Sequence, residues 1–264
     1  MTTKISIYIP TNRPQYWMRL YRSLLTNVTP FEVIFVGPVS SKFALPENVR
    51  HINSSVKPAQ CAEIGFRASE GEFCVFALDD IVFGERALDI LYTRFLQMGR
   101  DDIVISCEPW LNGEMLDTRR YRFWDRDINS PMTPICGLYK KSVMESLGGI
   151  DKNFICSFWD IDLAMRLFET GGTGQFCPGA VANEIVDDNE NRLCSYGYKV
   201  DRPTLDSLWT LTQKEYKRQR DLPITYINAK KVNGVIRKNR IKPVESFSSE
   251  NICKVSQGPK GKWL

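Results

Sequence analysis

The sequence predicts an α/β fold with a mainly parallel sheet flanked by helices, because strand-like and helix-like segments alternate from the N-terminus. Short runs rich in β-branched and aromatic residues predict strands, and apolar residues at helical spacing predict the helices between them. Helices are expected to cover both faces of such a sheet. The expected strands are 4–10, 31–36, 49–52, 73–78 and 103–107, and the expected helices are 15–27, 59–69, 85–98, 140–147, 160–169 and 206–220.

The first strand, helix and second strand illustrate the pattern. Residues 4–10 read KISIYIP and residues 31–36 read FEVIFV, and both runs have the composition of buried strands. Between them, Trp17, Leu20 and Leu24 recur at helical spacing. Glycines close later helices at Gly71, Gly148-Gly149 and Gly171-Gly172.

The composition is that of a globular protein. The 264 residues are 43% apolar and 25% charged. No run approaches the roughly 18 uncharged apolar residues that span a bilayer, and the N-terminus lacks the layout of a signal peptide, so we expect a cytoplasmic protein. The eight cysteines lie far apart without a CxxC motif, and His51 is the only histidine. We therefore expect neither a zinc site nor disulfides.

Positive charge gathers near the C-terminus, although the formal net charge is only +4. Segment 214–262 carries many Lys and Arg and few acids. A basic tail suits an anionic partner, such as a diphosphate, an acidic membrane surface or nucleic acid, and it is equally typical of a solvated surface segment.

Two adjacent aspartates, Asp79 and Asp80, follow the strongly apolar strand 73–78. Ligands of open α/β sheets bind beyond the carboxyl ends of the strands, so this position favours a functional role. Adjacent carboxylates repel each other unless they are solvated or bridged by a cation, and carboxylate oxygens suit Mg²⁺ or Mn²⁺ that carries phosphate oxygens. The alternative is a pair that caps the N-terminus of helix 85–98.

A second aspartate pair, Asp160 and Asp162, begins the expected helix 160–169. The two residues differ by about 200° around a helix axis, so they cannot point at one place. We expect one of them to face a pocket while the other caps the helix or pairs with Arg166.

The order of these segments resembles glycosyltransferase family 2, whose members are inverting enzymes of the GT-A fold. The resemblance covers about 4–178 and rests on four segments in the family's order. They are ISIYIPTNRP, KPAQCAEIGFRASEGEFCVFALDDI, CGLYKKSVMESLGGIDKNF and FWDIDLAMRLFETGG. It implies a GT-A catalytic domain over 1–200, followed by a C-terminal extension over 201–264 with a helix and a basic tail.

The resemblance also implies roles for individual residues. Thr11, Asn12 and Arg13 match the loop that holds the nucleobase and ribose of the donor. Asp79 matches the acid near the ribose and is a second candidate metal ligand, and Asp80 matches the ligand of a Mn²⁺ or Mg²⁺ ion. Asp160 matches the catalytic base, which accepts the proton of the acceptor hydroxyl while the diphosphate leaves from the opposite face of the sugar.

The chain departs from the family pattern at several places. Gly37 stands where relatives have an acid for the nucleobase, and Ala62-Glu63 replaces the usual Arg-Asn. Trp159 replaces a glutamate beside the base, where its indole is able to form an apolar wall for a sugar ring. Glu184 follows Pro178-Gly179 near the place of a metal-binding histidine, as a substitute ligand or as a surface residue.

The segment 110–134 has no clean period and is expected to form a long functional loop. Within it, four arginines and three aromatic residues provide phosphate donors and stacking faces. They are Arg119, Arg120, Arg122, Arg126, Tyr121, Phe123 and Trp124. We expect this loop to close over the donor or to bind an anionic acceptor, and the alternative is an ordinary surface loop.

These features favour a metal-dependent glycosyltransferase, of the hexosyl or related class, that moves a sugar from a nucleotide-diphosphate-sugar to a glycan, a lipid-linked or another hydroxyl acceptor. Two alternatives remain open. One is a degenerate GT-A-like module that binds a nucleotide or sugar without turnover. The other is a nucleotidyltransferase, against which stands the absence of a glycine-rich phosphate loop after the first strand. We expect no nucleic-acid partner, and peripheral membrane contact through the basic tail is the remaining expectation.

Overall fold

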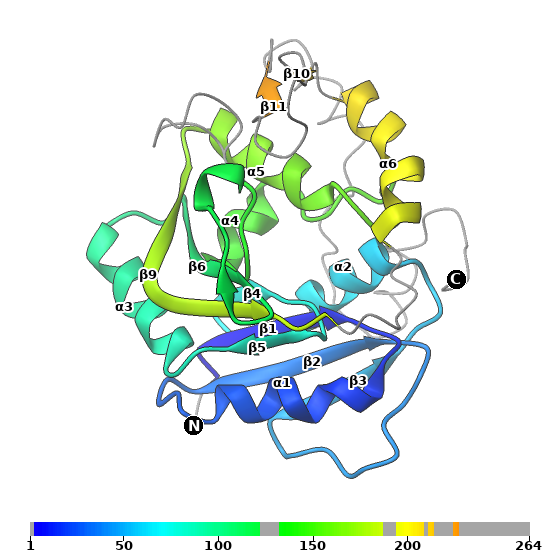
Figure 1. Cartoon of the computed structure of the whole chain (residues 1–264), viewed down its shortest axis with the longest axis vertical. Helices are drawn as coiled ribbons and strands as arrows, with labels where there is room; N and C mark the ends of the chain where they lie inside the picture. The colour runs from blue at the N-terminus through cyan, green and yellow to red at the C-terminus, as the bar shows by residue number, and fades with distance from the viewer. Residues whose placement is uncertain (1–2, 122–131, 187–193, 209–210, 214–223, 227–264) are drawn as a thin grey trace.

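The computed structural model describes residues 3–121, 132–186, 194–208, 211–213 and 224–226, which form a sheet flanked by helices (Figure 1). The strands of the main sheet are β1 (Ile5–Pro10), β2 (Phe31–Gly37), β3 (Val49–Asn53), β4 (Phe73–Phe76), β5 (Ile81–Phe83), β6 (Ile103–Leu111), β7 (Glu114–Met115), β8 (Leu138–Lys140) and β9 (Thr173–Glu184). The helices are η1 (Pro14–Tyr16), α1 (Trp17–Leu24), α2 (Pro58–Ala68), α3 (Ala87–Met98), η2 (Thr118–Tyr121), α4 (Lys141–Ser146), α5 (Trp159–Glu169) and α6 (Cys194–Leu208). A separate pair, β10 (Leu211–Gln213) and β11 (Ile224–Tyr226), is antiparallel.

The main sheet has the order β3-β2-β1-β4-β8-β6-β9-β5, with β7 paired to β6. Its first four strands in this order are parallel, as the alternation of strands and helices predicts. The other half is mixed, because β8 is antiparallel to both β4 and β6 and β5 is antiparallel to β9. The antiparallel strands β5 and β8 are three residues long, which is too short for a hydrophobic period to reveal them.

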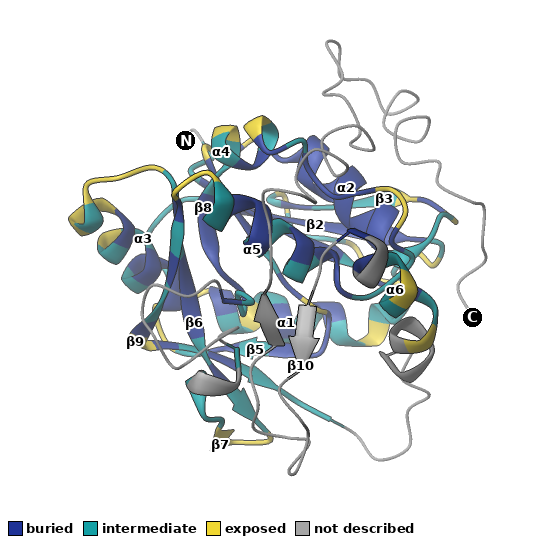
Figure 2. Cartoon of the chain, turned by 90° about the horizontal axis from the view of Figure 1, so that it is seen from above, coloured by how far each residue is buried: buried dark blue, intermediate teal, exposed yellow. Residues whose placement is uncertain are grey.

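Helices cover the sheet on two faces, and each face has its own apolar core (Figure 2). On one face α1 and α3 share one apolar cluster with the strands, in which α3 packs on β6 and β9, and Trp17 stacks on Phe35 with 4.3 Å between ring centroids. On the other face α2, α5 and α6 share a second cluster. Gly65 allows α2 to lie close to β1, because it has no side chain. A Cβ atom at this position would be only 2.9 Å from the Cβ of Tyr8.

Most expected elements are present, and the main error concerns the last helix. The sequence predicts a helix over 206–220, whereas α6 occupies Cys194–Leu208 and residues 211–213 form β10. The sequence gives little indication of α6 because Gly197 and Pro203 lie inside it, and both residue types disfavour helix interiors. Helix α6 crosses the division at residue 200, and that division stays a prediction.

Two expectations about the whole chain concern cysteines and membranes. The six cysteines whose side chains the structure describes are free thiols. They are Cys61, Cys74, Cys107, Cys136, Cys156 and Cys177. Among the described helices, none combines the length and apolar character that crossing a bilayer requires.

Candidate functional site

The loop 11–13 and the pair Asp79-Asp80 lie together at the carboxyl ends of neighbouring parallel strands. Strands β1 and β4 pair in register up to Tyr8 and Phe76, and the backbone N–H of Ala77 donates to the carbonyl of Tyr8 at 3.2 Å. The two chains therefore leave the sheet side by side. This confirms the expectation that the pair follows a strand end, where open α/β sheets bind ligands.

The hydroxyl of Thr11 is the centre of a buried hydrogen-bond network. It donates to Oδ2 of Asp79 at 2.5 Å and accepts the indole N–H of Trp17 at 3.0 Å and the backbone N–H of Arg13 at 3.1 Å. Thr11 and Asp79 are buried, at 1% and 3% exposure. The Thr11 side chain thus fixes the course of the loop rather than presenting its hydroxyl to a ligand.

Arg13 pairs with both aspartates. Its Nε donates to Oδ2 of Asp79 at 3.2 Å, its Nη2 contacts Oδ1 of Asp79, and the same Nη2 donates to Oδ2 of Asp80 at 2.9 Å. The guanidinium also lies 5.2 Å from the ring centroid of Tyr16. One guanidinium thereby reduces the repulsion between two adjacent buried carboxylates. Asn12, which precedes Arg13, is partly exposed.

Burial dominates the electrostatics of this cluster. Loss of solvent raises the pKa of Asp79, while the hydrogen bonds from Arg13 and Thr11 oppose the rise. The pKa of Arg13 is raised, because its hydrogen bonds and attraction to Asp79 and Asp80 outweigh the cost of burying the guanidinium. Arg13 therefore favours the charged form of Asp79 and opposes the effect of burial.

Asp80 lies beside Glu184 across the junction of β5 and β9. Ile81 pairs in register with Glu184, and the backbone N–H of Ile185 donates to the carbonyl of Asp80 at 3.0 Å. Burial raises the pKa of the Cys136 thiol, and the nearby carboxylates of Asp80 and Glu184 raise it further. The structure thus brings Glu184 to the carboxylate edge, where the family pattern has a histidine.

This donor set fits a cation that arrives with phosphate oxygens. Among the described residues, no group of three His, Cys, Asp or Glu side chains converges as a metal site. Mg²⁺ typically takes one or two protein carboxylates and completes its coordination with phosphates and water. Asp80 and Asp79 supply these one or two carboxylates. In this structure both of them are paired with Arg13.

The alternative role of Asp79-Asp80, as a cap of helix 85–98, is wrong. Strand β5 separates the pair from α3, and the residue at the N-cap of α3 is Arg86. The sequence suggested a cap because β5 is too short to be recognised, so that the pair seemed to precede the helix directly.

The second pair divides its roles along α5. Asp162 is fully buried and pairs with Nη2 of Arg166 at 2.7 Å, one helical turn away. The predicted pairing with Arg166 is therefore confirmed. Arg166 also donates to the carbonyls of Leu147 at 2.6 Å and Gly149 at 2.8 Å, which ties α5 to the turn that follows α4.

Asp160 lies in the first turn of α5, where its carboxylate contacts backbone N–H groups. Among the hydrogen bonds of the described residues, its carboxylate accepts only backbone N–H groups, from its own residue and from Ile161. Loss of solvent around the partly exposed side chain raises its pKa, and the two backbone hydrogen bonds only moderate the rise. The raised pKa makes this carboxylate a stronger base than an ordinary aspartate, which suits it to accept a proton.

Trp159 links Asp160 to the strand that carries the first pair. Its ring packs edge-on against Phe76 of β4, with 4.5 Å between centroids, and it is only 5% exposed. The indole therefore belongs to the second apolar core. The hypothesis that it forms a wall for a sugar ring does not fit this burial.

The backbone turns sharply just before α5. Phe158 is a buried residue with φ of 65°, in the left-handed region that bulky side chains rarely adopt. Such a conformation costs about 1–3 kcal/mol and persists only where surrounding contacts impose it. The turn therefore depends on the contacts of the loop that precedes it.

Glu63, which replaces a residue of the family pattern, has a structural role. It accepts the backbone N–H of Ile150 at 2.8 Å and pairs with Nε of Arg67 at 2.7 Å, and both charged residues are buried. Gly149, with φ of 73°, lies against this pair, where an added Cβ would be 2.7 Å from Oε1 of Glu63. The pair fixes the glycine turn between α4 and α5.

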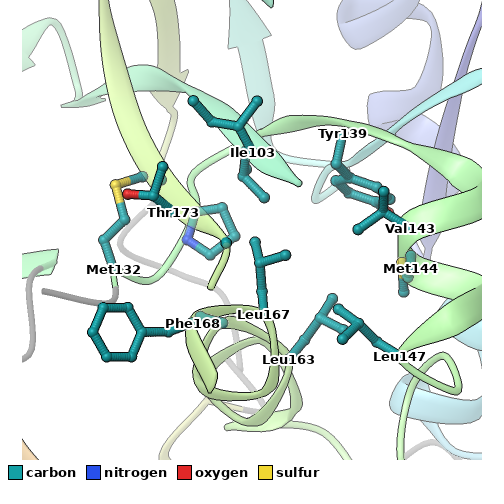
Figure 3. A pocket seen from close by; sticks show the side chains of 15 residues that line it. Ile103, Met132, Tyr139, Val143, Met144, Leu147, Leu163, Leu167, Phe168 and Thr173 are labelled. Carbon is teal, nitrogen blue, oxygen red and sulfur yellow. The ribbon is translucent and has the colours of Figure 1, made fainter. Parts of the chain in front are cut away.

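A small apolar pocket lies between α5 and the sheet (Figure 3). Leu163 and Leu167 point into it from α5, below Ile103 and Tyr139 of the sheet, and the ring of Phe168 lies beside Met132. Its volume is about 40 Å³, which accommodates only a few water molecules, and none of the described side chains that line it is charged. A pocket of this size is too small for a nucleotide. The apolar residues on this side of α5 therefore serve packing.

The arginine-rich hypothesis falls mostly outside the described residues, because 122–131 and 227–264 are not among them. Arg122, Phe123, Trp124, Arg126 and the basic tail lie there. Tyr121 is described, and its ring packs on Phe176 at 5.9 Å between centroids. The remainder of segment 110–134 is more regular than expected, since β6 runs to Leu111 and is followed by β7 and η2.

Comparisons with known proteins establish the fold. No family model and no curated protein matches the sequence. The structure of S. aureus TarS 1-349 in complex with UDP-GlcNAc matches with a TM-score of 0.59 at 16% identity, covering 89% of this chain and 71% of that chain. The structure of GalNAc-T7 with UDP, GalNAc and Mn²⁺ matches with a TM-score of 0.59 at 14% identity, covering 82% of this chain and 49% of that chain. The chain has the GT-A fold, as the sequence resemblance predicts.

Proposed function

We propose that this chain is a metal-dependent glycosyltransferase, which transfers a sugar from a nucleotide-diphosphate-sugar to an acceptor hydroxyl with inversion. The observation that carries the proposal is the arrangement of carboxylates on the GT-A fold. Asp79 and Asp80 follow β4, and Asp160 begins α5, whose Trp159 packs on Phe76 of that same strand. Two carboxylate groups with different environments are thus linked to the carboxyl end of β4.

Asp160 is the proposed general base. As the acceptor oxygen bonds to the anomeric carbon, the proton of its hydroxyl passes to the Asp160 carboxylate. The bond from that carbon to the diphosphate breaks on the opposite face, which inverts the configuration. The raised pKa of Asp160 brings its basicity closer to the working pH, which favours this role.

Asp80 is the proposed cation ligand, with Asp79 as its partner and Glu184 as a neighbour. A bound Mn²⁺ or Mg²⁺ would neutralise the charge that the leaving diphosphate gains. Thr11, Asn12 and Arg13 form the proposed nucleoside-binding loop, which Asp79 fixes through Thr11 and Arg13. The nucleotides in the matched TarS and GalNAc-T7 structures support uridine diphosphate sugars as the donors to test first, and Mn²⁺ in the latter supports the cation.

Thermal unfolding with nucleotides and cations tests this proposal. We expect UDP or a UDP-sugar with Mn²⁺ to raise the Tm, because a ligand at 100 times its Kd stabilises the folded state by about 2.7 kcal/mol. Chelation of the cation should remove most of the shift. Asp80→Ala should also remove the cation dependence, whereas Asp102→Asn, at an exposed acid paired with Arg100, should retain it.

Two outcomes contradict the proposal. One is the absence of any response to uridine, guanosine or thymidine diphosphates, and the other is a response that ignores the cation. Binding without release of UDP from any UDP-sugar, with or without added acceptors, would instead indicate a binding module that lacks turnover.

A further inference from the structure

Asp201 of α6 is a fully buried acid whose carboxylate binds backbone rather than a cation. Its Oδ1 accepts the N–H of Ile155 at 2.8 Å, and its Oδ2 accepts those of Cys156 and Ser157, both at 2.7 Å. Three consecutive amides thus converge on one side chain that lies more than forty residues away along the chain. Hydrogen bonds to an ionised acceptor are the stronger kind, so this contact is a firm anchor.

Helix α2 holds the same loop from its other side. The backbone N–H of Ala59 donates to the carbonyl of Ile155 at 2.9 Å. Nε2 of Gln60 donates to the carbonyls of Lys152 at 2.9 Å and Phe154 at 2.7 Å. The amides of this loop are therefore fixed by α6 and its carbonyls by α2.

The loop directs the start of α5. Phe158, in the left-handed region, directly follows the three anchored residues, and its carbonyl accepts the N–H of Asp162 at 2.9 Å to close the first helical turn. Asp160 lies within that turn, three residues after Ser157. A displacement of the anchored amides therefore passes directly to the Asp160 carboxylate.

We infer that Asp201 is a positioning residue for glycosyl transfer, which holds the turn 155–158 so that Asp160 points at the acceptor hydroxyl. This inference rests on the proposed function. Asp201 does not touch the reacting atoms, and its effect passes through the backbone. Among the described residues, the nearest ion pair on α5 is Asp162 with Arg166, which is part of the same helix and independent of Asp201.

The test compares Asp201→Asn with Asp89→Asn. Asp89 is a buried acid on α3 that likewise accepts backbone amides, from Val28 and Thr29, but at the amino end of β2. We expect Asp201→Asn to lower kcat about 10- to 100-fold with little change in the KM for the donor, because small misplacements of reacting groups have effects of this size. Asp89→Asn should lower the Tm while leaving kcat and KM unchanged.

The pH profile separates positioning from a general loss of structure. Loosening the turn admits water around Asp160, which relieves the burial that raises its pKa, so the acid limb of kcat should move to lower pH in Asp201→Asn. Gln60→Ala, which frees the loop carbonyls from α2, should move kcat and the limb in the same directions. It serves as the second variant where Asp201→Asn folds poorly.

The two proposals fail in different ways. If wild-type protein neither transfers nor hydrolyses any donor sugar, the proposed function falls, and this role falls with it. If wild type is active while Asp201→Asn and Gln60→Ala lose only stability, with kcat and the acid limb unchanged, the positioning role alone is overturned.

Discussion

The two aspartate pairs of this chain are similar in sequence and different in environment. Asp79 and Asp80 share the guanidinium of Arg13, so both carboxylates keep a cationic partner. In the second pair, Arg166 reaches Asp162 alone, and Asp160 has only backbone N–H groups in the described part of the chain. The first pair therefore suits a site that exchanges one cation for another, and the second leaves one carboxylate to accept a proton.

Helix geometry accounts for the second pair. Residues four apart lie on one helix face, which brings Asp162 and Arg166 together inside the core, whereas Asp160 lies about 200° from Asp162 around the axis. In the first pair, both aspartates belong to a turn after β4 and contact the same loop. Secondary structure thus determines which carboxylate keeps a charged partner.

The largest expected effect is that of Asp160→Asn on transfer. The amide retains the size of the side chain and removes its basicity, so kcat should fall about 10²- to 10⁴-fold, the usual contribution of a general base. The KM for the donor and the nucleotide-dependent rise in Tm should change little. Steady-state kinetics with a UDP-sugar donor measures this effect. Retained turnover would assign the base elsewhere and remove the functional contrast between the pairs.

Arg166→Met should cause the largest loss of stability. It leaves Asp162 as a buried carboxylate without its guanidinium, which typically costs about 3–5 kcal/mol. Urea unfolding should show this as a lower midpoint. The double variant Asp162→Leu/Arg166→Met, which removes both charges, should recover part of the loss. Equal losses in the single and double variants would show that the bonds from Arg166 to the carbonyls of Leu147 and Gly149 matter more than the ion pair.

Local side-chain pairs could be predicted from the sequence, whereas contacts between distant segments could not. The pairing of Asp162 with Arg166 was predictable because it depends on local helical spacing. The contact of Arg13 with Asp79 was not, because it requires two loops that meet only when β1 and β4 pair. Asp201 gave no sequence signal, since its partners are backbone amides of a distant loop. The Gly and Pro residues inside α6 also concealed the helix that carries it.

Arg13→Gln should change the first pair by an intermediate amount. Removing the guanidinium frees Asp80 and Asp79 for a metal ion, so the affinity for Mn²⁺ without nucleotide should rise at least about tenfold, because one hydrogen bond to a charged group is worth roughly 1.5–3 kcal/mol. Isothermal titration with Mn²⁺ measures this change. Arg100→Gln, at an exposed pair with Asp102, is the control that should leave the affinity unchanged. A weaker affinity in Arg13→Gln would mean that the guanidinium helps to build the cation site.

The smallest expected effect is a pH dependence of stability that belongs to Asp160. Its pKa in the folded state lies above the ordinary value of about 3.9. The folded state therefore holds the proton more tightly than the unfolded state. The contribution of this group to the free energy of unfolding is complete below the ordinary pKa, and it is lost as the pH rises through the folded-state pKa.

Urea titrations of wild type and Asp160→Asn at several pH values isolate this contribution, since the buried acids Asp79, Glu63 and Asp151 are common to both proteins. The difference between the two proteins should decline across that window and then level off. A difference that does not change with pH would show that Asp160 titrates as it does in the unfolded chain, and the contrast between the two pairs would then rest on geometry alone.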